Sequence, residues 1–148
     1  MTWYHIFNGD ADGLCSMVQL YRSAPQPDAV IVTGRKRDIN LLDRVNPSKG
    51  DNLTVLDISM RSNTDDLRRI LKTEAQVFYV DHHNAGDVPE DDNLMAVIDT
   101  SPQMCTAILV DDILSGAYRA WAVTAAFGDN FPNLARARAR GHDYPLES

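Results

Sequence analysis

The sequence has no long apolar run and few cysteines. No stretch approaches the roughly 20 consecutive apolar residues that a membrane-spanning helix needs. The N-terminal residues lack a basic segment followed by an apolar run, so we expect no secretory signal. With two cysteines, Cys15 and Cys105, a disulfide framework is not expected. These absences predict a cytoplasmic protein without a membrane-spanning segment.

Positive charge is also scarce. The chain has 14 Lys and Arg residues against 21 Asp and Glu residues, which gives a net charge of −7. This balance argues against extensive nonspecific binding to nucleic acid. A carboxylate-rich metal site would account for part of it, because bound cations offset such charges. The length of 148 residues and the hydrophobic fraction of 44% fit one soluble domain with a core of its own.

Short apolar runs alternate along the chain with longer amphipathic segments. We expect strands over residues 3–7, 29–33, 53–58, 75–80 and 94–98. We expect helices over residues 14–21, 40–45, 105–114 and 118–127, and another that begins at Ser62. Ser62 and Asp65 have the spacing of a capping box, with Asp in place of Glu or Gln. The alternation predicts an α/β fold, with a three-layer, mostly parallel, Rossmann-like sheet flanked by helices.

Acidic and imidazole side chains follow several of these strands. They come after the first, third and fourth strands and after the last expected helix. In chain order the candidates are Asp10, Asp12, Asp57, Asp81, His82, His83 and Asp129. Because ligands in such sheets bind at the carboxyl ends of the strands, we expect these side chains to meet at one edge of the sheet.

The chemistry of this set suits divalent metal ions. Carboxylates combined with one or two imidazoles favour Mn²⁺, Mg²⁺, Fe²⁺ or Zn²⁺, and we expect no thiolate in the cluster. Two metal ions about 3.5–4 Å apart stabilise the attacking and leaving oxygens of a phosphoryl displacement. Asp57 lies in the middle of the set and is the natural candidate for a bridging carboxylate.

Two other motifs resemble part of this pattern. Residues 8–13 resemble the opening of an EF-hand loop, but Gln19 at its last position cannot supply the bidentate carboxylate of that loop. Residues 10–14 fit the opening motif of haloacid-dehalogenase phosphatases, in which Asp10 would be a covalent nucleophile. That mechanism needs paired acids on a later loop, whereas Asp111 and Asp112 lie in an expected helix. It also leaves residues 81–83 without a role.

The tripeptide Asp81-His82-His83 resembles the signature of the DHH phosphoesterase superfamily. Residues 8–16 are similar to the first motif of that family, a turn that leads into a helix. Residues 55–59 are similar to its second motif, and residues 128–130 to its fourth. The motifs occur in family order over about 120 of the 148 residues. The first motif is most similar to that of the exonuclease-like branch.

The resemblance implies a set of metal ligands. Asp10 would hold one metal ion and Asp12 the other, with Asp57 bridging the two. His82 and Asp129 would complete the second site. The cofactor implied is a pair of divalent ions, with Mn²⁺ favoured and Mg²⁺ as the alternative.

The resemblance also implies catalytic and substrate-binding residues. His83 would face the substrate phosphate and assist the leaving group, while Asp81 would orient the imidazoles. A metal-bound hydroxide would be the nucleophile of this two-metal mechanism. Ser16 would either contact the substrate or cap the following helix.

The sequence departs from the family pattern in two places. Many members carry a histidine where this chain has Ile6. The neighbouring His5 points to the other side of a strand, so we expect it in a core or surface role, with Asn8 or water as a replacement ligand. Members also continue into a smaller substrate-binding domain. We therefore expect a catalytic domain over residues 1–130, a tail over residues 131–148, and a truncated chain.

Basic residues gather in two segments. Arg35, Lys36 and Arg37 follow the second expected strand and either contact phosphate or form a solvated loop, which is the simpler interpretation. In the tail we expect three solvated arginines and a histidine without a role: Arg136, Arg138, Arg140 and His142.

Together these patterns predict a hydrolase of phosphoester or phosphoanhydride bonds that acts on nucleotides or single-stranded oligonucleotides. The alternative hypothesis is a non-catalytic module of the same fold that binds metal and nucleotide. The expected partner is a phosphate-containing small molecule or a single-stranded nucleic acid, and no membrane. Whether two copies form a homodimer stays open.

Overall fold

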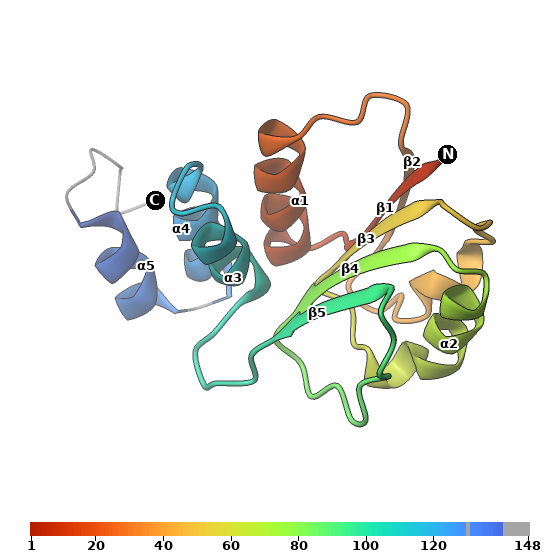
Figure 1. Cartoon of the computed structure of the whole chain (residues 1–148). Coiled ribbons are helices and arrows are strands. Elements are labelled where there is room, and N and C mark those ends of the chain that lie inside the picture. The colour runs from red at the N-terminus through yellow and green to blue at the C-terminus, as the bar shows by residue number, and fades with distance from the viewer. Residues whose placement is uncertain (130, 141–148) are drawn as a thin grey trace.

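Five parallel strands form the centre of the molecule in the computed structural model, which describes residues 1–129 and 131–140. The strands are β1 (Trp3–Asn8), β2 (Val30–Gly34), β3 (Asn52–Leu56), β4 (Gln76–Asp81) and β5 (Leu94–Ile98). The helices are α1 (Ala11–Ser23), α2 (Thr64–Lys72), α3 (Thr106–Ile113), α4 (Arg119–Gly128) and α5 (Pro132–Ala139), with short 3₁₀ segments η1 (Leu41–Arg44) and η2 (Arg61–Asn63). This architecture confirms the predicted α/β fold (Figure 1).

The strands lie in the order β2-β1-β3-β4-β5, and every neighbouring pair is parallel. In the middle of the sheet Ile6 pairs with Val32 on one side and with Val55 on the other. Because all strands run the same way, the residues that follow β1, β3 and β4 emerge side by side at one edge of the sheet.

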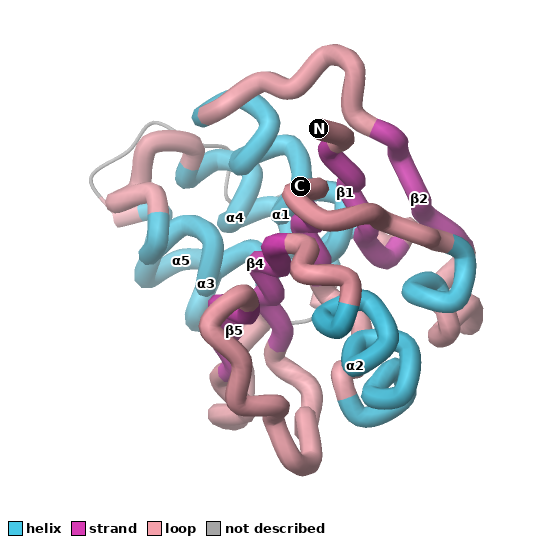
Figure 2. The backbone as a smooth tube through the Cα atoms, turned by 45° about the vertical axis from the view of Figure 1, so that its right-hand side comes forward, coloured by secondary structure: helices cyan, strands magenta, loops and turns pink. Residues whose placement is uncertain are grey.

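Helices cover both faces of the sheet (Figures 1 and 2). Successive side chains of a strand point to opposite faces, so Ile6 and Phe7 pack into different cores. Ile6 lies in the core shared with α2, where Leu67 and Ile70 are fully buried. Phe7 lies in the core shared with α1 and α3, together with Leu109. Both faces are therefore closed by apolar contacts, which is typical of a parallel sheet.

Helices α4 and α5 lie beyond α1 and α3, on the side away from the sheet (Figure 1). Small side chains allow this close approach: Ala122, Ala126 and Ala135 are fully buried in one apolar cluster. Helix α5 was not predicted, because its buried face consists mainly of alanine. The proposed division of the chain after residue 130 stays a prediction.

Three expectations about local structure are wrong. Helix α1 begins at Ala11, ahead of the predicted residue 14. Helix α2 begins at Thr64, and its N-cap is Asn63, so Ser62 forms no capping box. The Asn63 amide group instead donates to the carbonyl oxygens of Ile39 at 2.6 Å and Ser59 at 2.8 Å. These bonds, the first to a residue 24 positions away and the second to a residue four positions away, fix Asn63 at the start of α2.

Among the residues that the structure describes, no helix has both the length and the apolar character needed to cross a membrane.

Candidate metal centre

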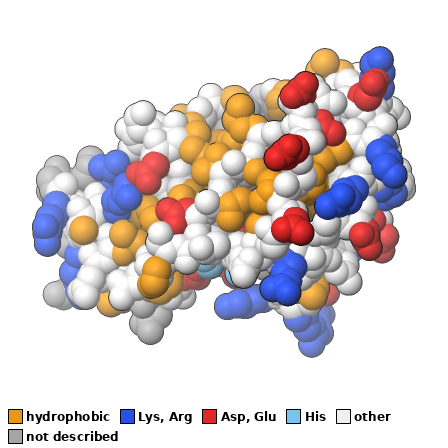
Figure 3. Space-filling view, turned by 60° about the horizontal axis from the view of Figure 1, so that its bottom comes forward, with side chains coloured by type: hydrophobic (Ala, Val, Ile, Leu, Met, Phe, Trp, Pro, Cys, Tyr) orange, Lys and Arg blue, Asp and Glu red, His pale blue; other side chains and the backbone are white. Residues whose placement is uncertain are grey.

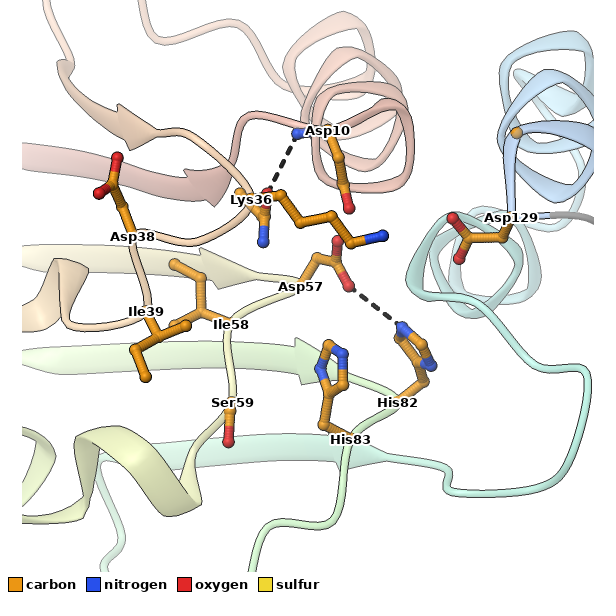
Figure 4. Close-up of a pocket in the computed structure, with 12 residues that line it drawn as sticks. Asp10, Lys36, Asp38, Ile39, Asp57, Ile58, Ser59, His82, His83 and Asp129 are labelled. Carbon is orange, nitrogen blue, oxygen red and sulfur yellow. Dashed lines mark hydrogen bonds and ion pairs between the residues drawn. The ribbon is translucent and has the colours of Figure 1, made fainter.

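The order of the strands brings three of the predicted site segments together. Asp10 follows β1, Asp57 follows β3, and β4 ends at Asp81. Since these strands are adjacent and parallel, the three segments meet at the carboxyl edge of the sheet (Figure 4).

The turn from β1 into α1 is built around Asp10. Its Oδ1 accepts a hydrogen bond from the Gly13 N–H group at 3.0 Å, which makes Asp10 the N-cap of α1. The Asp10 N–H group donates to Asn8 Oδ1 at 3.1 Å. A side chain at position 13 is excluded, because a Cβ atom on Gly13 would lie 2.0 Å from the Asn8 carbonyl oxygen. The first motif is therefore a tight helix start that exposes one side of the Asp10 carboxylate.

Asp12 is buried beneath this turn, and its carboxylate accepts hydrogen bonds from the N-terminus of α3. Its side chain is 1% exposed. Its Oδ2 accepts from the Thr106 N–H group at 3.0 Å, and its Oδ1 accepts from the Ala107 N–H group at 2.8 Å. The N-cap residue of α3, Cys105, forms no side-chain cap of its own. Asp12 thus satisfies these N–H groups from 94 and 95 positions away in the chain, and the helix dipole stabilises its negative charge.

Asp57 occupies an unusual backbone conformation at the end of β3. Its φ angle is +61°, in the left-handed region that costs free energy for a residue other than glycine. The Asp57 N–H group donates to the Val80 carbonyl at 3.0 Å, and the Tyr79 hydroxyl donates to the carbonyl of the next residue, Ile58, at 2.6 Å. The Thr106 hydroxyl donates to Asp57 Oδ1 at 3.1 Å. These three bonds hold the carboxylate toward Asp12.

The two histidines after β4 have different partners. His82 Nε2 lies 3.2 Å from Asp57 Oδ1 and 3.4 Å from Asp12 Oδ2. His83 Nδ1 lies 2.7 Å from Asp81 Oδ1, and Asp81 itself is fully buried. The hydrogen bond to Asp81 is the largest cause of the raised pKa of His83. His82 therefore lies among the candidate metal ligands, while His83 is a partly exposed imidazole held by a buried carboxylate.

Asp129 reaches the same place from the end of α4. It is the C-cap residue of that helix, and its N–H group donates to the Ala125 carbonyl at 2.9 Å. Ligand atoms of Asp12, Asp129 and Cys105 all lie within 4.8 Å of one another. A second such group consists of Asp57, Asp81, His82 and His83.

A sulfur atom lies near the carboxylates, although Cys105 is not among the site residues that the sequence predicts. Cys105 is fully buried at the start of α3. Burial, followed by the charge of Asp12, raises the pKa of its thiol far above the usual range. Without a cation nearby, this raised pKa keeps the group a neutral thiol beside the carboxylates.

Crowding of carboxylates perturbs the site. Burial, then the charges of Asp12 and Asp10, raises the pKa of Asp57 to about 10. The same causes raise the pKa of Asp129 to about 6, although His82 and Lys36 act in the opposite direction. Carboxyl groups in this state lack the positive charge that would allow them all to ionise. The donor set of carboxylate oxygens and an imidazole nitrogen therefore fits hard or borderline divalent cations.

A pocket of about 490 Å³ opens over this cluster. In the space-filling view, histidine surface lies in an indentation at the lower edge of the molecule, with acidic and basic side chains beside it (Figure 3). Besides predicted site residues, the lining includes Lys36, Asp38 and Ser59, which the sequence did not assign to the site. A volume of this size suits a ligand as large as a nucleotide.

Several other predicted residues lie elsewhere. Ser16 is fully buried and its hydroxyl donates to the Asp12 carbonyl at 2.7 Å, so it offers a substrate no contact and acts within α1. His5 is 3% exposed under α1, in the core role that was expected. Arg138 pairs with the carboxylates of Asp111 and Asp112, so the expectation that it is solvated is wrong. His142 lies outside the described residues.

The chain belongs to the DHH family. The sequence profile described as "DHH family, N-terminal domain" matches residues 3–133, which is most of the chain. None of the curated proteins compared with the chain matches it.

Among solved structures, the chain is similar to the crystal structure of exonuclease RecJ bound to manganese. The two share 20% sequence identity with a TM-score of 0.54, over 87% of this chain and 38% of the RecJ chain. This likeness shows a common fold, and the chain spans well under half the length of that relative.

Proposed function

We propose that this chain is the metal-binding part of a phosphoesterase, which hydrolyses phosphoester or phosphoanhydride bonds with two divalent cations. The observation that carries the proposal is the convergence of carboxylates and an imidazole from four separate segments at one edge of the sheet. The segments follow β1, β3 and β4 and the end of α4. Membership of the DHH family supports the same conclusion.

The proposed ligands are those that the family resemblance implies, and four of them, Asp12, Asp57, His82 and Asp129, belong to the two groups of neighbouring donor atoms. Asp10 and Asp12 would each hold one cation, and Asp57 would bridge the two. His82 and Asp129 would complete the second site beside Asp12. Mn²⁺ is the proposed ion, supported by the oxygen and nitrogen donors and by the manganese in the similar RecJ structure. When bound, the cations supply an acidified water molecule as nucleophile and offset negative charge on the phosphoryl group.

The chain's own residues would supply orientation and a proton. Asp81 holds Nδ1 of His83, which leaves Nε2 of that ring to face a substrate. The raised pKa of His83 keeps the ring protonated at higher pH than an ordinary histidine. His83 would therefore donate a proton to the leaving oxygen.

The proposed substrates are nucleotides or short single-stranded oligonucleotides. The pocket volume of about 490 Å³ matches a nucleotide unit. The similar structure is that of an exonuclease, which supports a nucleic-acid phosphodiester as the bond that is cleaved.

The test is hydrolysis of bis-p-nitrophenyl phosphate and of a 5′-phosphorylated thymidine dinucleotide with added Mn²⁺. Asp57→Asn keeps the shape and the left-handed backbone, and we expect it to lower the rate by roughly 10³-fold or more, because it removes the bridging charge. Asp28→Asn, on an exposed loop, is the matched control and should leave the rate unchanged. Mn²⁺ uptake without turnover in the wild-type chain would instead support the non-catalytic binding module.

A further inference from the structure

The loop that follows β2 carries a basic residue into the pocket. Because β2 is parallel to β1 and adjacent to it, residues 35–38 emerge at the same edge of the sheet as Asp10. Lys36 lines the pocket, and Figure 4 shows its side chain extended over the floor toward Asp57 and Asp129. The neighbouring Arg37 is exposed and is absent from the lining.

This loop is fastened to the first motif. The Gly9 N–H group donates to the Gly34 carbonyl at 2.9 Å, and a Cβ atom on Gly9 would lie 2.2 Å from that oxygen. Asp38 Oδ2 accepts from the Arg35 N–H group at 2.7 Å, and the Asp38 N–H group donates back to the Arg35 carbonyl at 2.8 Å. The backbone that carries Lys36 is thus a closed turn held against the turn that carries Asp10.

Lys36 forms no ion pair with the residues that the structure describes. Within the described part of the chain, no carboxylate oxygen lies within 4.0 Å of its ammonium nitrogen, and no other Lys or Arg lines the pocket. Its effect reaches Asp129, whose pKa it lowers against the opposing effects of burial and the other carboxylates. Bound divalent cations would offset the charge of those carboxylates and so weaken their electrostatic attraction for the Lys36 ammonium group. The ammonium group would then be free to pair with an anionic ligand.

We infer that Lys36 binds an anionic phosphoryl oxygen of the substrate and so helps to determine specificity for phosphate-containing ligands. The inference rests on the proposed function, because it assumes that the pocket over the carboxylates holds the substrate. A lysine acts there as a flexible point charge, which holds a phosphate without requiring one fixed geometry.

The experiment compares Lys36→Ala, Lys36→Arg and Arg37→Ala in steady-state hydrolysis of the thymidine dinucleotide at saturating Mn²⁺. Arg37→Ala is the matched control because it removes the same charge from the same loop outside the pocket. We expect Lys36→Ala to lower kcat/KM roughly 10- to 100-fold, mainly through KM, since a hydrogen bond to a charged group is lost. Lys36→Arg should retain at least about a third of the wild-type kcat/KM because the charge remains, and Arg37→Ala should stay within about twofold.

A second readout separates substrate binding from an effect on the metal site. Mn²⁺ titration by calorimetry should give the same affinity for Lys36→Ala and Arg37→Ala. Equal kcat/KM for these two variants, or a change in Mn²⁺ affinity without a change in KM, would overturn the inference. Both results require an active wild-type chain, whereas failure of the proposed function would appear as no Mn²⁺-dependent turnover in the wild type.

Discussion

Carboxylates are buried on α3 and at the carboxyl edge of the sheet, and the two places differ in whether positively charged side chains lie beside them. Asp111 on α3 is fully buried between Arg119 Nη2 at 3.2 Å and Arg138 Nη1 at 3.4 Å. At the edge of the sheet, Asp12 and Asp57 are buried with peptide N–H groups, a hydroxyl and the His82 imidazole, but without Lys or Arg within 4.0 Å in the described residues. The two arginines offset the charge of Asp111, whereas the negative charge around Asp12 and Asp57 is left for a bound ligand to offset. Burial of acidic groups is therefore informative about function only when the compensating charge is missing.

The largest change in stability should come from a substitution at Asp111, which pairs with Arg119 and Arg138. Asp111→Asn leaves two partly buried guanidinium groups without their shared partner, and we expect the free energy of unfolding to fall by about 3 kcal/mol. Urea unfolding followed by circular dichroism measures this change. Asp112→Asn is the control, because its half-exposed side chain pairs with Arg138 alone and should cost less than about 1 kcal/mol. Equal losses in the two variants would show that burial of Asp111 contributes nothing.

At the metal centre an Asp-to-Asn substitution should increase the free energy of unfolding, whereas at Asp111 it should decrease it. The folded pKa of Asp57 is raised to about 10, so stability present at low pH is lost as pH rises from the unfolded value toward 10. Asn carries no charge at any pH, and we therefore expect Asp57→Asn to raise the free energy of unfolding at pH 7 by roughly 1–3 kcal/mol in a metal chelator. Added Mn²⁺ should reverse the order by stabilising the wild type more than the variant. Destabilisation of the chelated variant would contradict the account of charge crowding.

A third buried titratable group lies under α1, away from both clusters. Burial lowers the pKa of His5, and its two ring nitrogens have no hydrogen-bond partner among the described residues. The unfolded chain therefore takes up a proton below pH 6.5 that the folded chain resists. Stability should fall with decreasing pH in this range, by at most about 1.4 kcal/mol for each pH unit. Urea unfolding of wild type and His5→Phe from pH 7 to pH 5 isolates this contribution, because the free energy of unfolding of the wild type should fall relative to that of the variant as the pH is lowered. A difference between the two proteins that does not change with pH would contradict the lowered pKa of His5.

The smallest effect should come from a hydroxyl that supports the metal centre without facing it. Tyr79 is fully buried and donates to the Ile58 carbonyl, next to the left-handed Asp57. Tyr79→Phe should lower the free energy of unfolding by about 1 kcal/mol. It should also weaken Mn²⁺ binding in calorimetry, because the Asp57 backbone is less firmly held. Loss of stability with unchanged Mn²⁺ affinity would limit Tyr79 to a packing role.

Much of the fold could be predicted because the signals are local. The apolar run at 53–58 and the acid that ends it correspond to β3 and Asp57. The segment that ends at Asp81 corresponds to β4. Parallel order then brings such ends together. The local capping rule failed at Ser62, because α2 begins at Thr64 and the Asn63 side chain is held by the carbonyl of Ile39, 24 positions away in the chain.

The remaining features of the site depend on how distant segments dock. Thr106 and Cys105 join the cluster only because α3 places its N-terminus on Asp12. One local signal existed, since α3 starts at residues that provide no side-chain cap of their own. Lys36 lines the pocket because a hydrogen bond between Gly9 and Gly34 holds its loop beside the first motif. The run of basic residues at 35–37 does not indicate which of them faces the pocket. Such contacts arise from the tertiary structure and are not specified by a local pattern in the sequence.

We propose that acidic residues from separate segments of the chain share divalent cations at one edge of the sheet. Crystals of the wild-type chain soaked in Mn²⁺ and measured at the manganese absorption edge test it most directly. We expect two strong anomalous peaks bounded by the proposed ligands, and we expect these peaks to weaken or disappear in Asp57→Asn crystals. The ligands are Asp10, Asp12, Asp57, His82 and Asp129. Anomalous signal confined to surface carboxylates, with no peak between Asp12 and Asp57, would contradict it.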